Sequence, residues 1–243
     1  MRIAGIIDVS TVDVPKIPVI VLFVAGCNFD CPFCHNYAIC RPKAGFNASV
    51  EEIAEKLGRN IVAEGVNISG GEPTIQADII ELVGQLKERG MGFVGMDSNG
   101  SQPKIIKQLA MHVNRFAIDF KAPWEDYGQV TGSDNFNVEV QETMNFLGQA
   151  FQGDLEFRTT VIREFHSTDS LVKMARYLQN LPFDGTWVLQ QYQFSRGVNP
   201  AMKGAFTAWN RDQMYEHASC LQREYCIQMA LRTASNGYEV IQI

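Results

Sequence analysis

Three cysteines with the spacing Cys-x3-Cys-x2-Cys are the residues of this chain best suited to chemistry. Three thiolates at this spacing can bind three irons of a four-iron cluster, whereas a fully ligated cluster has four cysteines. One iron would keep an open position for a substrate or cofactor, as a catalytic zinc does. The spacing therefore predicts a catalytic [4Fe–4S] cluster whose ligands are Cys27, Cys31 and Cys34.

Two other metal sites and a structural role fit parts of the same pattern. Zinc could take His35 or Cys40 as its fourth ligand, although the adjacent side chains of Cys34 and His35 would have difficulty sharing one tetrahedral ion. Residues 31–35 also match the CxxCH sequence of covalent c-type haem, which would leave Cys27 unexplained. Structural burial explains a single cysteine better than three at motif spacing. The remaining cysteines are interpreted as core or spectator thiols: Cys40, Cys220 and Cys226.

The segment before the first cysteine predicts the element that positions all three. Residues 18–25 are apolar and rich in β-branched side chains, which is the pattern of a strand buried on both faces. The cysteines would then lie on a loop at the carboxyl end of this strand, where α/β barrels place their active sites. We define the cluster loop as residues 26–45.

Strand-like and helix-like segments alternate along the rest of the chain, which gives six βα units. Such units predict a parallel sheet with right-handed crossovers. Six strands are too few for a closed eight-stranded barrel. We therefore expect an α/β fold with a mostly parallel, open sheet, a partial (β/α)6 barrel, in one domain over residues 1–243. The later strands are expected at 65–69, 93–97, 115–120, 155–162 and 186–191, with a short extra strand at 238–243. Helices are expected at 50–58, 75–89, 103–111, 138–151, 168–180 and 209–225.

Composition limits the partners and the compartment. The 243 residues are 46% hydrophobic and 20% charged with a formal net charge of −6, as in soluble globular proteins. An acidic chain without a basic stripe predicts no nucleic-acid partner. The longest apolar run, 19–25, is far too short to span a bilayer, and Asp8 interrupts the apolar start too early for a signal peptide. We therefore expect a cytoplasmic protein with reduced thiols and no membrane partner.

Glycines and polar residues follow the predicted strands. Gly70 and Gly71 would let backbone approach a ligand closely, and Glu72 could receive an ammonium group. The same residues could also form a plain turn before a helix. Asp119 and Lys121 point the same way on an extended segment, so a structural salt bridge is possible there. Carboxyl ends of parallel strands share one edge, so these groups should converge. Further candidates of this kind are Asp97, Ser98, Asn99, Arg158, Arg163, His166, Gln190, Gln191, Tyr192 and Gln193.

The cysteine loop, the segment Gly70-Gly71-Glu72-Pro73 and their order resemble the radical S-adenosylmethionine (SAM) superfamily. The resemblance implies a partial (β/α)6 barrel and a [4Fe–4S] cluster, with SAM bound to the open iron through its amine and carboxylate. One electron from the cluster would cleave SAM to methionine and a 5′-deoxyadenosyl radical, which abstracts hydrogen from the substrate. The cofactor supplies this chemistry, so no catalytic residue beyond the cluster and SAM is expected.

A narrower resemblance lies in residues 7–15, 26–28 and 34–36. These segments resemble the activating proteins of anaerobic ribonucleotide reductases and the pyruvate formate-lyase activating enzymes, which install a glycyl radical on a partner enzyme. The resemblance implies a glycyl radical enzyme as partner, first of all anaerobic ribonucleotide reductase. It also implies an electron donor such as flavodoxin or ferredoxin.

The same resemblance implies the ligand contacts. Gly71 and Glu72 would contact the SAM amine, and Phe33 would lie near its adenine. Gln193 stands where pyruvate formate-lyase activators have a histidine near that adenine. Residues that match positions near the methionine part are Asp119, Lys121 and Arg158. A monovalent cation beside SAM would be held at Asp97, Ser98 and Asp119. Gly70 and Asn99 complete the predicted cofactor-binding set.

Two other functions are compatible with the sequence. Residues 71–76 also resemble the deazapurine-forming enzymes of modified-nucleoside synthesis, which favours a radical SAM enzyme that acts on a small molecule or a nucleoside. The third reading is a non-catalytic iron–sulfur protein, which would not cleave SAM.

Overall fold

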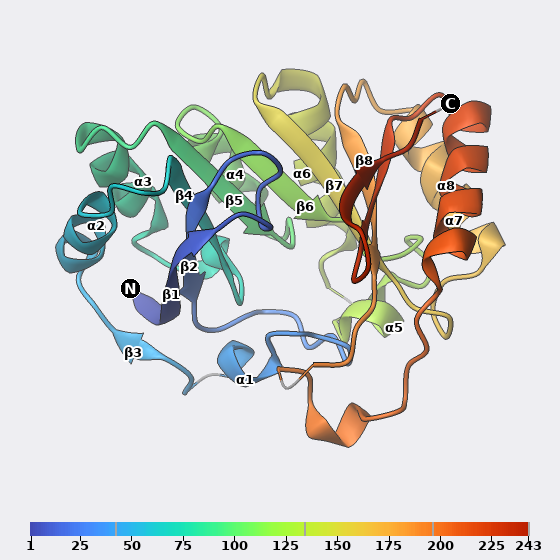
Figure 1. The fold of residues 1–243 in the computed structure, drawn as a ribbon, viewed down its shortest axis with the longest axis horizontal. Coiled ribbons are helices and arrows are strands. Elements are labelled where there is room, and N and C mark those ends of the chain that lie inside the picture. Colours follow the sequence, from blue (N-terminus) through green and yellow to red (C-terminus); the bar gives the residue numbers. More distant parts are fainter. Residues whose placement is uncertain (42, 134, 196, 243) are drawn as a thin grey trace.

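The computed structural model describes residues 1–41, 43–133, 135–195 and 197–242. Its centre is a curved sheet with the strand order β10-β9-β8-β7-β6-β5-β4-β2-β1-β3 (Figure 1). The strands β2 and β4 to β9 are parallel to one another, whereas β1 runs antiparallel to β2 and β10 runs antiparallel to β9. The strands are β1 Arg2–Ser10, β2 Val19–Val24, β3 Phe46–Asn47, β4 Gly65–Gly70, β5 Phe93–Ser98, β6 Arg115–Asp119, β7 Asp154–Val161, β8 Thr186–Gln191, β9 Met229–Thr233 and β10 Gly237–Val240.

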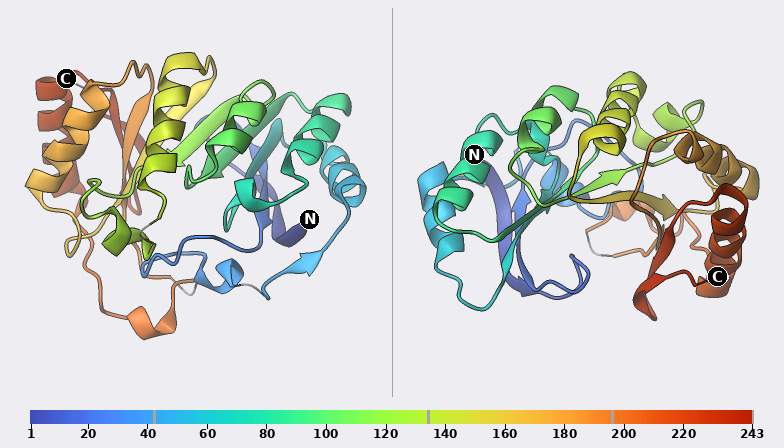
Figure 2. Two further views of the ribbon diagram at one scale, coloured as in Figure 1. Left: turned by 180° about the vertical axis from the view of Figure 1, so that it is seen from behind. Right: turned by 90° about the horizontal axis from the view of Figure 1, so that it is seen from above.

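Helices cover the outer, convex face of this sheet, and the two ends of the sheet stay apart (Figure 2). The predicted α/β fold with a mostly parallel, open sheet is confirmed. The helices are α1 Tyr37–Cys40, α2 Val50–Gly58, α3 Ile79–Glu88, α4 Pro103–Leu109, α5 Tyr127–Thr131, α6 Asn137–Ala150, α7 Thr168–Gln179 and α8 Arg211–Tyr225, with 3-10 turns at Pro73–Ile75 and Pro200–Met202.

The pattern of apolar runs in the sequence predicted six strands, and all six are present, as β2 and β4 to β8. Their apolar side chains are almost all buried, which explains why the sequence pattern was clear. Helix α2 begins at Ser49, whose hydroxyl accepts a hydrogen bond from the Glu52 amide in a capping box. The helix predicted from 75 is divided, because Pro73–Ile75 forms a 3-10 turn and α3 begins only at Ile79.

Strands β1, β3 and β9 were not predicted, and they extend the sheet at both ends. Strand β1 pairs antiparallel with β2, and its Ile7 and Val9 are 46% and 39% exposed. Such an edge strand has neither a continuous buried run nor a strict alternation to mark it. Strand β10 lies within the extra strand expected at 238–243, of which residue 243 lies outside the described residues. Within the described part of the chain, no helix is both long and apolar enough to cross a membrane.

Candidate functional site

The cysteine loop and the carboxyl ends of the strands enclose a cavity of about 330 Å³. This volume lies at the lower end of the range of small-molecule sites. The predicted residues that line it are Cys27, Cys31, Phe33, Cys34, Gly70, Gly71, Glu72, Asp97, Ser98, Asn99, Asp119, Lys121, Arg158 and Gln190. Gln193 is not one of the lining residues, and it is exposed. The structure thus brings together most of the residues selected from the sequence, whereas the candidates Arg163, His166, Gln191 and Tyr192 also lie outside the lining.

The three cysteine thiols differ in their surroundings. Hydrogen bonding to the Cys40 thiol lowers the pKa of Cys34 to about 7 and also lowers the pKa of Cys27. Burial raises the pKa of Cys31 to about 12. Iron binds the thiolate, and the pKa values of two of the three thiols are shifted toward that form. Three soft sulfur ligands around one cavity fit a [4Fe–4S] cluster. Across the described residues, no three His, Cys, Asp or Glu side chains are arranged to hold a single metal ion.

Gly70 and Gly71 lie against protein backbone. Gly70 has a φ of +121°, and a Cβ on Gly71 would lie 1.8 Å from the carbonyl oxygen of Gly26. The close approach expected from two glycines is therefore made by β4 to the start of the cluster loop. The amide of Glu72 also donates a hydrogen bond to the Gly26 carbonyl, over 2.8 Å. These contacts fix the cluster loop to the end of β4.

The Glu72 carboxylate is fully buried and accepts hydrogen bonds from neutral donors. They are the amide and hydroxyl of Thr74, the hydroxyl of Ser98 at 2.7 Å and the amide of Asn99 at 2.6 Å. Burial raises its pKa, although these hydrogen bonds oppose the rise. The carboxylate thus joins the ends of β4 and β5, and its contact with a SAM amine stays a prediction.

Asn99, which the sequence predicted, and Asn28 and Asn36, which were not among the predicted site residues, attach the cluster loop to the strands. The Asn99 amide donates to the Asn28 side chain over 2.9 Å, and the Asn28 amide donates to the Ser101 hydroxyl over 2.8 Å. The Asn36 amide donates to the Gly70 carbonyl over 2.8 Å. Asn28 and Asn36 stand directly beside motif cysteines, and this adjacency was the available sequence signal.

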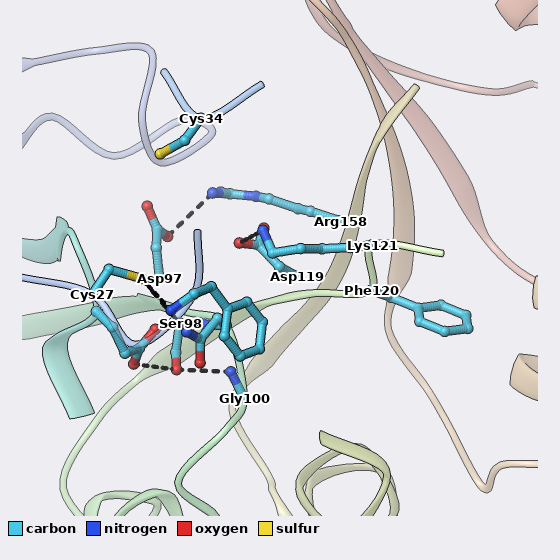
Figure 3. A network of polar contacts seen from close by, with 12 residues as sticks. Cys27, Cys34, Asp97, Ser98, Gly100, Asp119, Phe120, Lys121 and Arg158 are labelled. Atoms are coloured by element: carbon cyan, nitrogen blue, oxygen red, sulfur yellow. Dashed lines mark hydrogen bonds and ion pairs between the residues drawn. The ribbon is translucent and has the colours of Figure 1, made fainter. Parts of the chain in front are cut away.

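The opposite side of the cavity is built from ion pairs (Figure 3). Arg158 on β7 lies 3.2 Å from Asp97 and also contacts Glu156, while Lys121 lies 2.7 Å from Asp119. Burial would lower the pKa of Arg158, but Asp97 and Glu156 outweigh this effect and raise it. The salt bridge left open by the sequence between Asp119 and Lys121 is therefore present, inside the cavity.

The Arg158 guanidinium also keeps a free donor. Its Nη2 atom is buried without a hydrogen-bond partner in the part of the chain that the structure describes. A buried guanidinium with a spare N–H is suited to an anionic ligand group such as a carboxylate. The surroundings of Arg158 therefore fit the methionine part of SAM, which carries a carboxylate and which the family resemblance places near this residue.

Further residues that the sequence did not select line or support the cavity. Arg232 comes from β9, and its Nη2 donates to the Asp13 carbonyl over 3.3 Å, which links the two ends of the open sheet. Arg115 is fully buried beneath the cavity and contacts Glu156 over 2.6 Å. Of the other strand-end candidates, His166 is buried, with its Nε2 2.8 Å from the Lys121 carbonyl.

An aromatic group borders the cavity beside the cysteines. The Phe33 ring is 5.9 Å from Phe165 and 6.4 Å from Phe206, and Tyr192 lies 5.9 Å from Phe206. His35 packs on Tyr192 at 5.9 Å, and burial lowers the pKa of this histidine. Flat apolar rings at a polar cavity are suited to stacking a nucleobase. Phe33 therefore lies in surroundings that fit an adenine.

The fold and this site define a radical SAM protein. The model of the radical SAM superfamily matches residues 21–179, which is more than half of the chain, and the chain belongs to this superfamily. Membership implies a [4Fe–4S] cluster and SAM as cofactors, and the cysteine trio and the cavity fit both.

Three proteins are similar to this chain in amino-acid sequence. A protein of Methanocaldococcus jannaschii, provisionally named a glycyl-radical enzyme activating enzyme, is 26% identical over 245 residues and covers 98% of both chains. A second protein of the same organism and provisional name is 29% identical over 172 residues, 68% of this chain and 65% of that one. A protein of Saccharolobus solfataricus, provisionally named a GTP 3′,8-cyclase, is 33% identical over 129 residues, 48% of this chain and 39% of that one.

Solved structures share the fold at low sequence identity. TYW1 with a lysine–pyruvate adduct has a TM-score of 0.68 at 16% identity, over 92% of this chain and 79% of that one. A domain of pyruvate-formate lyase-activating enzyme from Bacteroides vulgatus has a TM-score of 0.56 at 15% identity, over 69% and 98%. For Streptococcus suis SuiB the TM-score is 0.66 at 12% identity, over 87% of this chain and 47% of that longer one.

Proposed function

We propose that this radical SAM enzyme is a glycyl-radical-enzyme activating enzyme, and that its partner is anaerobic ribonucleoside-triphosphate reductase or a similar glycyl radical enzyme. The observation that carries the proposal is the match to the first Methanocaldococcus jannaschii relative over 98% of both chains. The cyclase relative, in contrast, shares only 48% of this chain. A match over the whole length supports a shared reaction better than a match over half of it.

In this proposal the residues of the cavity bind and orient the cofactors. Cys27, Cys31 and Cys34 hold the cluster, which with SAM supplies a 5′-deoxyadenosyl radical when both are bound. Lys121 and Arg158 receive the carboxylate of the methionine part, since both are cations at the cavity wall.

Other residues orient the rest of SAM in this proposal. Phe33 stacks the adenine, and Gly70, Gly71, Glu72, Ser98 and Asn99 form the wall beside the amine. A monovalent cation at Asp97 and Asp119 belongs to the proposal. So does an adenine contact of Gln193, which would require its exposed side chain to turn toward the cavity.

The remaining parts of the proposal concern the domain organisation, the cellular compartment and the electron donor. The enzyme acts as a single radical SAM domain in an anaerobic cytoplasm, and it takes its electron from a carrier such as flavodoxin or ferredoxin. An iron with an open position is exposed to oxidants, so we expect activity to be lost in air. The partner must present a glycine to the cavity, and SAM must be shielded there from water.

The test is anaerobic reconstitution with iron and sulfide, reduction with dithionite, and addition of SAM together with a co-encoded glycyl radical enzyme. We expect 5′-deoxyadenosine by chromatography and a glycyl radical by electron paramagnetic resonance (EPR). A partner with its radical glycine changed to alanine is the control. If 5′-deoxyadenosine forms without a radical on any co-encoded glycyl radical enzyme, the activating role is wrong while the superfamily chemistry stands.

Cys31→Ala tests the cysteine assignment in the same assay. We expect no SAM cleavage above background, because two thiolates cannot hold the cluster with one open iron. Cys220→Ala is the matched control, since Cys220 is exposed on α8. Normal 5′-deoxyadenosine production by Cys31→Ala would show that the ligands were assigned wrongly.

A small molecule or nucleotide is the second candidate substrate, favoured by the provisional cyclase name of the Saccharolobus solfataricus relative. This function predicts that a purified nucleotide or deazapurine precursor stimulates 5′-deoxyadenosine production without any partner protein. A panel of such compounds, GTP among them, tested in the same assay separates the two functions.

A further inference from the structure

Cys40 lies against the predicted cluster ligands, although it was interpreted with Cys220 and Cys226 as a core or spectator thiol. Its Sγ is 3.8 Å from the Sγ of Cys34, within hydrogen-bonding distance for sulfur. The side chain is 7% exposed and lines the same cavity. Cys220 and Cys226, in contrast, are exposed. The cavity therefore has four thiols rather than three.

The position of Cys40 is fixed by contacts that do not involve sulfur. Cys40 is the last residue of α1, whose N-cap Asn36 donates its side-chain amide to the Gly70 carbonyl. The preceding residue, Ile39, accepts a hydrogen bond from the Gly26 amide over 2.8 Å. These bonds tie α1 to β4 and to the start of the cluster loop. Cys40 is therefore held beside the ligands by backbone geometry.

The chemistry of the ligands decides which sulfur donates. A cysteine that binds iron is a thiolate, which has no S–H and can only accept a hydrogen bond. If Cys34 is a ligand, the hydrogen that it shares with Cys40 must belong to Cys40. Cys40 thus stands as a thiol donor next to a ligating sulfur.

We propose that Cys40 donates an S–H···S hydrogen bond to the cluster ligand Cys34 and thereby raises the reduction potential of the cluster. A proton near a ligating sulfur stabilises the extra electron of the reduced cluster, and hydrogen bonds to sulfur are among the factors that set such potentials. The role of Cys40 is that of a positioning residue, because it acts through the ligands. The proposal depends on the cluster that superfamily membership implies and not on the identity of the partner.

The experiment compares the wild-type protein with Cys40→Ala and Cys40→Ser, and with Cys220→Ala as the matched control. Each protein is reconstituted anaerobically, its iron and sulfide are measured, and the cluster is titrated with dithionite at set potentials while EPR reports the reduced form. SAM and partner are absent, so failure of the proposed function would not affect the result.

At a fixed potential, we expect the ratio of reduced to oxidised cluster in Cys40→Ala to fall about threefold, the size expected for loss of a weak hydrogen bond. Cys40→Ser, whose hydroxyl can still donate, should lie between Cys40→Ala and wild type, and Cys220→Ala should match wild type.

Three results would overturn the proposal. The first is an unchanged titration of fully loaded Cys40→Ala. The second is a Cys40→Ala protein that loses iron while its remaining clusters titrate like wild type, because Cys40 would then only support the loop. The third is an EPR line shape of the reduced cluster that differs between wild type and Cys40→Ser, because Cys40 would then bind iron itself.

Discussion

Glu72 and Glu156 are both buried carboxylates next to the same cavity, and their surroundings are opposite. Glu72 follows β4, and its hydrogen-bond donors are neutral amides and hydroxyls. Burial raises its pKa. Glu156 on β7 lies between two guanidinium groups, those of Arg115 and Arg158. Burial alone would raise its pKa, but Arg158 and Arg115 outweigh burial and lower the pKa to about 2.

The contrast between Glu72 and Glu156 reflects two kinds of interaction that hold the two sides of the site together. On the side of β4 and β5, neutral hydrogen bonds and closely packed glycines hold the cluster loop against the strands. On the side of β6 and β7, charged side chains pair with one another, and some of them, such as Arg158, Asp119 and Lys121, line the cavity. Loss of a neutral donor costs one hydrogen bond, whereas loss of one buried charge leaves its partners uncompensated. The charged side should therefore be the more sensitive to substitution.

Glu156→Gln should have the largest effect on stability. Removing the carboxylate takes from the buried Arg115 its shortest ion pair, at 2.6 Å, and from Arg158 one of its two carboxylate partners. Breaking such a buried pair costs about 3–5 kcal/mol. Urea unfolding followed by circular dichroism measures the loss. Glu88→Gln, on the exposed end of α3, is the control and should stay within about 0.5 kcal/mol of wild type. Equal stability of the two variants would remove the distinction between the two sides.

The second largest effect should be the loss of unfolding free energy at acid pH. The folded-state pKa of Glu156 is depressed below its usual 4.5, so its contribution is present above pH 4.5 and is lost as the pH falls toward 2. The loss approaches roughly 3 kcal/mol, at about 1.4 kcal/mol for each unit of pKa difference. Unfolding free energies at a series of pH values measure it, and Glu156→Gln should show a flatter acid limb.

The contribution of Glu72 to stability should change with pH in the opposite direction. Its folded-state pKa is raised, so its contribution is present below pH 4.5 and is lost as the pH rises through the raised value. Glu72→Gln should therefore not flatten the acid limb in the way that Glu156→Gln does. An identical change of the pH profile in both variants would contradict the contrast between them.

Gly71→Ala tests the close packing of the neutral side. The added Cβ would meet the Gly26 carbonyl at 1.8 Å, so the start of the cluster loop must shift. We expect a loss of about 2–3 kcal/mol, typical of overpacking, together with lower iron content after reconstitution. Gly84→Ala on α3 is the matched control, because nothing lies within 4 Å of its Cβ. It should stabilise the helix by up to about 1 kcal/mol.

Glu72→Gln should have the smallest effect on stability at neutral pH. One amide NH2 would face donors that the carboxylate now accepts from, which costs about 1–3 kcal/mol, but the cost of a buried charge disappears. We expect a net loss of about 1 kcal/mol in urea unfolding at pH 7. A loss as large as that of Glu156→Gln would show that Glu72 also depends on charged neighbours.

The parallel strands and the chemical character of the site could be predicted from the amino-acid sequence. Residues 18–25 are buried on both faces, so their apolar run could mean only a central strand, and Ser49 caps its helix by a local hydrogen bond. The three cysteines lie close together along the chain, and each strand-end residue directly follows its own strand. Local patterns of this kind need no knowledge of the fold, and they also led to the superfamily.

Only the tertiary structure decided which distant residues meet. Arg115 was expected merely to begin a strand, but the parallel register of β6 with β7 brings it to Glu156, 41 residues later. Edge strand β1 and strand β9 were missed, and with them the link from Arg232 to Asp13 across 219 residues. Cys40 was interpreted as a core or spectator thiol, whereas the turn of α1 brings its Sγ to 3.8 Å from that of Cys34. Sequence patterns record local preferences, whereas ion pairs and thiol contacts depend on register and on folded loops.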